Sequence, residues 1–178
     1  YSIGTFPTLR PLEQIRNDCA YHHANVKVVC VGGGFVYGSL GMSHHATEDM
    51  AILRALPGVT VFTPGDPHEV EAIVPVMLNT PGTCYLRLGR GGEPFLHEGP
   101  IENWKVPQAL TLRVGTDVAL LSAGGILIQA MRNCSEELLD ALEVRAELFS
   151  AISQLLQDMA LEELAYACFR GLDPEVLE

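Results

Sequence analysis

The 178-residue sequence lacks several features that would place it in other classes of protein. Its five cysteines form no CxxC pair and no zinc-like spacing, and an odd, scattered set is typical of buried free thiols in a reducing compartment. We find no signal peptide and no apolar run of the ~18 residues that a membrane helix needs. We therefore expect a cytoplasmic protein without a membrane-spanning segment.

Basic residues are also scarce. The chain has 11 lysines and arginines against 22 acidic residues, which gives a formal net charge of -11. Binding to nucleic acid or to a membrane surface needs a basic field, so we expect neither partner. With 48% hydrophobic and 19% charged residues, the chain has enough apolar side chains for a real core.

The stretch from Val26 to Phe62 reads as a βαβ unit. Val26–Val31 is an apolar, β-branched run of strand length, and Val59–Phe62 is a second one. Between them, a glycine-rich loop leads into a helix whose acidic first turn begins near Thr47. In open α/β sheets, ligands bind at the carboxyl ends of the strands. The loop after the first strand is therefore the candidate site.

The flanking segments predict further elements of the same kind. Phe6–Pro11 is expected to be a loop, because two prolines four residues apart disfavour a regular helix. Leu12–Tyr21 has helical spacing. Asp66 is a good N-cap for a helix over His68–Leu78, and Thr83–Leu88 predicts a short strand.

The C-terminal part begins after a loop-like stretch, residues 93–113, where we place a domain boundary. Val118–Ser122 predicts a strand and is followed by a helix from about Ile126. Val144–Ser150 alternates like a strand, and Ile152–Ala167 predicts a helix.

Two aromatic or imidazole sites are candidates for chemistry. His44 and His45 lie in the loop at the carboxyl end of a strand, either as a surface pair or as groups that contact a ligand or transfer a proton. No carboxylate or cysteine lies at ligand spacing from them, so we expect no metal. Phe6 is either a stacking surface for a planar ring or an ordinary core residue.

The arginines that flank the end of the predicted strand Thr83–Leu88 are the other candidates. Arg87 and Arg90 are suited to bidentate capture of a phosphate or carboxylate, and the alternative is a salt bridge to some of the excess acid. Gly32–Gly34 matches neither GxGxxG nor GxxxxGK[ST], so it does not predict a nucleotide loop.

Three segments carry a resemblance to a known family: SIGTFPTLRPLEQIRND, GMSHHATEDMAILRALPGVTVFTPGDPHEV and CYLRLGRGGEP. In this order and spacing they resemble the pyrimidine-binding domain of transketolases, above all the separate C-terminal subunit of split bacterial transketolases. The resemblance implies an α/β fold with a doubly wound, mostly parallel sheet, incomplete at its N-terminus, followed by a partial α/β C-terminal domain. The implied limits are 1–95 for the pyrimidine-binding domain, 96–113 for a linker and 114–178 for the C-terminal domain, whose ending after Ser150 is atypical.

The same resemblance implies a function. The family binds thiamine diphosphate between the pyrimidine domain of one chain and the diphosphate domain of another, which also holds Mg²⁺, and moves a two-carbon ketol unit between sugar phosphates. By position, Phe6 would stack on the aminopyrimidine, Leu9 would stand where transketolases add a further aromatic, His44 would be the catalytic and substrate-facing histidine, and Arg90 would hold the substrate phosphate. We expect an oligomer with a partner chain, and no activity of this chain alone.

The sequence departs from the family in several places. The activating glutamate is expected before the GTF segment, ahead of Tyr1, and no GDG…N motif for Mg²⁺ and diphosphate is present. Gly32 and Leu40 replace a histidine and an aspartate that contact the sugar. Two alternatives therefore stay open: the β-chain of a 2-oxoacid dehydrogenase-like thiamine enzyme, and a non-catalytic interaction protein that retains the fold.

Overall fold

The computed structural model describes residues 1–115 and 119–133. The chain packs as two units, and the first consists of Tyr1–Ala109 together with Ala123–Ile128. The strand predicted over Val144–Ser150 and the helix predicted over Ile152–Ala167 lie outside the described residues. The predicted domain limits at 95 and 113 stay predictions.

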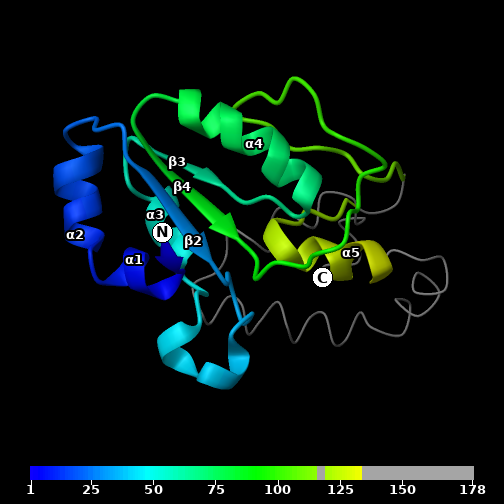
Figure 1. The fold of residues 1–178 in the computed structure, drawn as a ribbon, viewed down its shortest axis with the longest axis horizontal. Helices are drawn as coiled ribbons and strands as arrows, with labels where there is room; N and C mark the ends of the chain where they lie inside the picture. The colour runs from blue at the N-terminus through cyan, green and yellow to red at the C-terminus, as the bar shows by residue number, and fades with distance from the viewer. Residues whose placement is uncertain (116–118, 134–178) are drawn as a thin grey trace, which may run out of the picture. The chain divides into compact units, whose positions relative to one another are not determined.

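A four-stranded parallel sheet forms the centre of the first unit (Figure 1). Its strands are β1 (Ser2–Ile3), β2 (Lys27–Val31), β3 (Val59–Phe62) and β4 (Thr83–Leu88), in the order β1-β2-β4-β3. β4 lies in the middle, where Tyr85 pairs with Val28 on one side and Val61 on the other. The predicted α/β fold with a mostly parallel sheet is confirmed.

Helices connect these strands. They are α1 (Thr5–Leu9), α2 (Leu12–Gln14) with the π-helical continuation η1 (Ile15–Ala20), the short 3₁₀ turns η2 (Gly38–Leu40) and η3 (Met42–His44), α3 (Asp49–Arg54), α4 (Pro67–Asn79), the 3₁₀ turn η4 (Gly124–Ile126) and α5 (Leu127–Asn133). None of the helices in the described part of the chain has the length and apolar character to cross a membrane.

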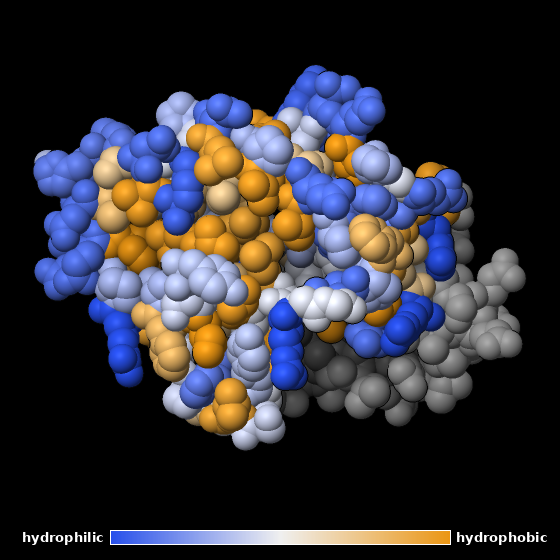
Figure 2. Space-filling view, viewed as in Figure 1, coloured by the Kyte–Doolittle hydropathy of each residue, from blue (hydrophilic) through white to orange (hydrophobic). Residues whose placement is uncertain are grey.

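The two faces of the sheet carry separate hydrophobic clusters. On one face, Phe62, Cys84 and Leu86 pack with Ile73 and Met77 of α4. On the opposite face, Cys30 and Tyr85 pack with Ile15 of η1 and Leu53 of α3. Successive residues of β4 therefore face opposite helices, as strand geometry requires, and the sheet is doubly wound. Figure 2 shows hydrophobic side chains over the strands, between α2 and α4.

The prediction of a loop over Phe6–Pro11 is wrong, because α1 occupies Thr5–Leu9. Pro7 is the third residue of α1, where a backbone N–H has no partner within the helix, so the proline removes no hydrogen bond. The hydroxyl of Thr8 donates to the carbonyl of Gly4 at 2.7 Å, which closes this short helix. The helix ends before Pro11.

The prediction of a strand over Val118–Ser122 is also wrong for the residues that the structure describes. Residues 119–122 have no regular structure and pair with none of the four strands. Leu120 and Leu121 are 52% and 62% exposed, so this apolar run has neither the neighbouring strand nor the burial that stabilises β-structure. The helix predicted from about Ile126 is confirmed by η4 and α5.

Candidate functional site

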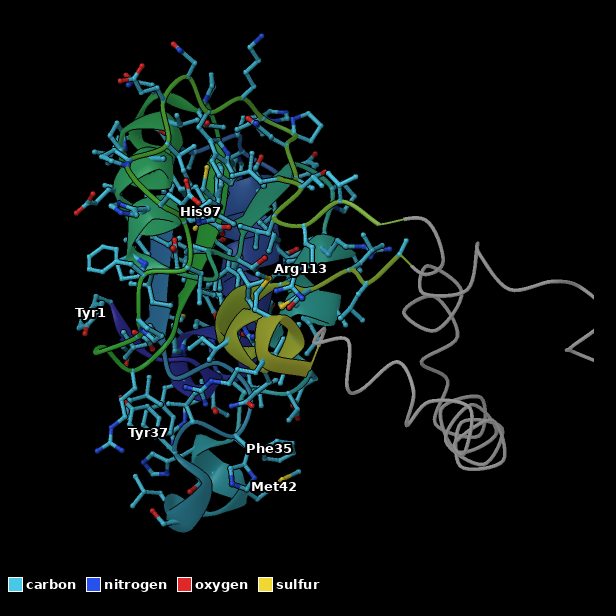
Figure 3. The ribbon with its side chains drawn as sticks, turned by 90° about the vertical axis from the view of Figure 1, so that its right-hand side faces the viewer. Tyr1, Phe35, Tyr37, Met42, His97 and Arg113 are labelled. Atoms are coloured by element: carbon cyan, nitrogen blue, oxygen red, sulfur yellow. The ribbon has the colours of Figure 1, made fainter. Side chains whose placement is uncertain are left out.

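The loops that follow the strands gather at one edge of the sheet, because all four strands are parallel. Gly4 follows β1, the long loop 32–48 follows β2, and Gly89–Glu93 follows β4. Figure 3 shows the β2 loop extending from this end of the molecule, with Phe35, Tyr37 and Met42 on it. Phe35 and Met42 are 70% and 76% exposed. Ligands of open α/β sheets bind at such an edge.

Phe6 and His44 lie next to each other at this edge. Their ring centroids are 5.3 Å apart and the planes meet at 66°, an edge-on contact. The hydroxyl of Thr5 donates to the carbonyl of His45 at 2.9 Å and so ties α1 to the β2 loop. Both Phe6 and His44 are half-buried, so the two residues predicted for one site are brought together.

The surroundings of this pair include Leu9 of α1, Arg10 directly after this helix and Ser43 of the β2 loop. The guanidinium of Arg10 lies 5.2 Å from the centre of the Phe6 ring, a contact that no sequence pattern indicated. Leu9 is 41% exposed. The hydroxyl of Ser43 lies 3.0 Å from Nδ1 of His44 and restrains its ring.

Arg90 is exposed in the loop after β4. Its guanidinium lies 5.7 Å from the centre of the Tyr37 ring, so it contacts the same β2 loop that carries His44. Cation–π contacts of this kind are worth about 0.5–1 kcal/mol at exposed sites. The side chain is therefore only weakly held in the structure.

Arg87 has a different role from the anion capture considered for it. Its Nε donates to Oδ2 of Asp49 at 2.9 Å, and its Nη2 donates to the carbonyl of Ala46 at 2.8 Å. The hydroxyl of Tyr85 donates to the same Asp49 oxygen at 2.5 Å. Asp49 is only 1% exposed, so Arg87 neutralises a buried carboxylate, and the salt-bridge alternative holds for this arginine.

Two groups in and beside this buried network are held in their protonated form. Burial, and then the charge of Asp49, raise the pKa of the Tyr85 phenol well above its usual range. Burial also raises the pKa of the neighbouring Cys30 thiol to about 11. Both groups stay protonated at neutral pH, and the network fastens β4 to the end of the β2 loop.

The glycines of the β2 loop make room for this network. A Cβ on Gly33 would lie 2.5 Å from Cζ of Arg87, and a Cβ on Gly32 would overlap the Tyr37 ring. Gly32 also has φ of 80°, which favours glycine. These glycines are thus required by packing, which the sequence pattern did not indicate.

A cleft of about 480 Å³ lies beside the network. It is lined by residues from the loops after β2 and β4 and from the Ala123–Ile128 segment, among them Gly34, Arg87, Glu93, Gly124 and Ile126. The backbone N–H of Gly124 donates to the carbonyl of Thr63, which fixes this segment at the end of β3.

Asp66, Glu69 and His97 form a second polar cluster, at the start of α4. Oδ1 of Asp66 accepts from the N–H of Glu69, while Oδ2 accepts from the N–H of Leu96 and from the N–H and Nδ1 of His97. Burial favours the neutral carboxyl, but these donors outweigh it and lower the pKa of Asp66 to about 2.

Among the described residues, this cluster is the one whose ligand atoms lie close enough together for a metal ion, within 4.8 Å of one another. Both oxygens of Asp66 already accept hydrogen bonds, however, and Oε2 of Glu69 accepts from the N–H of Gly65. The cluster therefore acts as a clip between α4 and the loop after β4. Figure 3 shows His97 on that loop.

Comparison with known proteins places the chain in a family. Residues 3–92 match the family described as "Transketolase, pyrimidine binding domain", which covers half of the chain. The chain belongs to this family. Residues 105–178 match the family described as "Hsp33 protein". This second match falls on the segment predicted to be a partial transketolase-like C-terminal domain.

Several curated relatives carry transketolase names. The chain is 36% identical over 125 residues to a subunit of the apulose-4-phosphate transketolase of Phocaeicola vulgatus, a match that covers 70% of this chain and 40% of the relative. It is 31% identical over 137 residues to "6-deoxy-6-sulfo-D-fructose transketolase subunit SqwH" of Clostridium sp., covering 76% and 42%. The chain thus spans about 40% of the length of these relatives.

A solved structure supports the same assignment. The protein described as "Split gene transketolase, inactive beta4 tetramer" superposes with a TM-score of 0.67 at 31% identity, covering 80% of this chain and 44% of that one. The predicted resemblance to the C-terminal subunit of split transketolases is confirmed.

Proposed function

We propose that this chain contributes the pyrimidine-side half of a thiamine diphosphate site in a transketolase-type enzyme. Membership in the family implies this cofactor. In the proposal a partner chain supplies the diphosphate side and Mg²⁺, and the enzyme moves a two-carbon ketol unit between sugar phosphates. The contact between Phe6 and His44 at the ligand edge of the sheet carries the proposal.

The residues around Phe6 fit the aminopyrimidine end of the cofactor. Phe6 offers a half-buried aromatic surface, and the exposed Leu9 on the same helix offers apolar area beside it. Stacking on such a ring contributes about 0.5–1.5 kcal/mol beyond the burial of its area. Arg10 lies over the Phe6 ring, so a stacked ring takes the opposite face or displaces this guanidinium. When bound, the cofactor supplies the carbon nucleophile that carries the two-carbon unit.

His44 and Arg90 would act on the substrate. The Ser43 hydroxyl at Nδ1 orients the His44 ring and leaves Nε2 for a sugar hydroxyl, with which it can exchange a proton. Arg90 is exposed and only weakly held by Tyr37, so it can turn to an anionic group. The names of two relatives, which are transketolase subunits for a sugar phosphate and for a sulfo-sugar, support an anionic sugar as substrate.

A reconstitution experiment tests this function. The purified chain with Mg²⁺ and thiamine diphosphate is assayed for ketol transfer, alone and with a split-transketolase subunit that carries the diphosphate-binding domain. We expect transfer and calorimetric binding of the cofactor only with the partner. Ketol transfer by the chain alone at a normal enzyme rate would contradict the proposal. Activity of the complex on 2-oxoacids only would favour a dehydrogenase β-chain. If the calorimetric titration with thiamine diphosphate gave no heat either with or without the partner, a non-catalytic protein would be favoured.

The match of residues 105–178 to the Hsp33 protein family favours a separate role for the C-terminal part. We infer that the thiamine site depends on the first unit only. A variant that ends after Asn133 keeps the Ala123–Ile128 segment and should bind the cofactor with the partner as the full chain does. Loss of binding with intact Trp104 fluorescence would contradict this inference.

A further inference from the structure

The carboxylate of Glu93 is held by the backbone of its own loop. Oε1 accepts from the N–H of Arg90 at 2.8 Å and from the N–H of Gly91 at 3.2 Å, and Oε2 accepts from Gly91 at 3.1 Å. Gly91 and Gly92 have φ of 99° and 85°, which allows consecutive N–H groups to converge on one acceptor. Such a concave set of backbone N–H groups is a nest for anions.

The position of this nest makes it relevant to a ligand. It lies after β4 at the ligand edge of the sheet, and Glu93 lines the cleft of about 480 Å³ together with Arg87 and Gly34. Gly89 packs so closely on Oε1 of Glu93 that a Cβ there would overlap the carboxylate. The loop is thus shaped around a bound anion, and in this structure that anion is part of the chain.

We propose that Glu93 is an internal substitute for the tetrahedral anionic head group, phosphate or sulfonate, of the substrate, which displaces it from the nest. This proposal rests on the proposed function, because it names the position that the substrate head group takes. The charges support an exchange rather than joint occupancy. Arg87 is already paired with Asp49, so its charge is not available to balance a second anion beside Glu93.

The exchange makes Glu93 a residue that sets the affinity of the nest for anions. When another group occupies a binding site for part of the time, a ligand can bind only while the site is open. Its apparent affinity is therefore reduced in proportion to the fraction of time that the site is open. If Glu93 fills the nest nine-tenths of the time, its removal should tighten anion binding about tenfold. Neutral sugars gain nothing from that removal, so Glu93 lowers the affinity for all anions that use the nest by the same factor and leaves neutral ligands unaffected.

Titration of the full chain with inorganic phosphate and, separately, with methanesulfonate tests this proposal. The variants are Glu93→Ala, Glu93→Gln, which keeps an oxygen acceptor without the charge, and Glu98→Ala. Glu98 is exposed nearby, so the last variant removes an equal charge without touching the nest. The backbone amides of Arg90 and Gly91 are followed by NMR, and Trp104 fluorescence confirms folding.

We expect both anions to shift the Arg90 and Gly91 amides at about tenfold lower concentration in Glu93→Ala than in the unchanged chain or in Glu98→Ala, with Glu93→Gln between them. Equal affinity in the Glu93 variants and the unchanged chain would overturn the proposal, and so would the absence of any shift at these amides in all variants. A response to only one anion would assign the nest to that head group. The titration needs neither thiamine diphosphate nor a partner, so its failure is distinct from failure of the proposed function.

Discussion

The substitution Asp66→Asn changes one atom in the cluster of Asp66, Glu69 and His97, which links α4 to the loop after β4. One carboxylate oxygen becomes an amide nitrogen. The carboxylate accepts hydrogen bonds from Glu69, Leu96 and His97, and it is 2% exposed. Although burial opposes ionisation, these donors lower the pKa of Asp66 from 3.8 to about 2. This lowering of the pKa corresponds to about 2 kcal/mol in the free energy of unfolding.

The sign of the pH dependence follows from the direction of this shift. Because the pKa of folded Asp66 lies below the unfolded value, the contribution is complete at neutral pH and is lost as the pH falls through 3.8 towards 2. The amide nitrogen of asparagine would face the N–H groups of Leu96 and His97. We therefore expect Asp66→Asn to lower the free energy of unfolding by about 2 kcal/mol at pH 7. Most of this difference from the unchanged chain should vanish near pH 2.

Urea unfolding followed by Trp104 fluorescence measures this effect. Trp104 is the single tryptophan and packs against the hydrophobic cluster that α4 shares with the sheet, so it reports on the first unit. The exposed Glu98, changed to glutamine, serves as the control for loss of one charge. A difference between Asp66→Asn and the unchanged chain that is the same at pH 7 and at low pH would refute this reasoning, as would no difference at pH 7.

Two further substitutions test the packing beside the site by the same unfolding assay. Gly33→Ala places a Cβ 2.5 Å from Cζ of Arg87 and should lower the free energy of unfolding by about 1–3 kcal/mol. Gly99 has open space around it, so Gly99→Ala should leave this free energy nearly unchanged. Equal losses in the two variants would contradict the role assigned to Gly33. Leu127→Ala removes a buried side chain that packs against Gly65 and should lower the free energy of unfolding by about 2 kcal/mol or more. A neutral result would show that the Ala123–Ile128 segment does not pack against the rest of the first unit.

The regular elements around the sheet could be predicted because local chemistry and tertiary packing agree there. β3 and β4 have the predicted bounds, since short β-branched or apolar runs are flanked by proline and glycine. Asp66 caps α4 as predicted. α1 was missed because a proline in the first turn of a helix costs nothing, while the sequence rule treats a proline as a break. Residues 119–122 were misassigned because an apolar run becomes a strand only beside another strand.

The candidate site was predicted in part. Phe6 and His44 were named from the sequence, and the structure places their rings in contact. The pairing of Arg87 with Asp49 joins residues 38 positions apart, so no local pattern could distinguish it from anion capture. The hydrogen bonds from the loop backbone to the Glu93 carboxylate depend on the directions of the N–H groups, which the sequence does not specify. The cluster of Gly89, Gly91 and Gly92 was the available signal for it.

The central claim is that this chain holds the pyrimidine end of thiamine diphosphate, and saturation-transfer NMR tests it most directly. This chain is combined with a perdeuterated partner subunit that carries the diphosphate-binding domain and with excess thiamine diphosphate, so that saturation reaches the cofactor from this chain. The transfer to each proton of the cofactor is then compared. The account predicts the strongest transfer at the pyrimidine methyl and ring protons, and its loss in Phe6→Ala. Strongest transfer at the thiazolium side, or an unchanged pattern in Phe6→Ala, would contradict it.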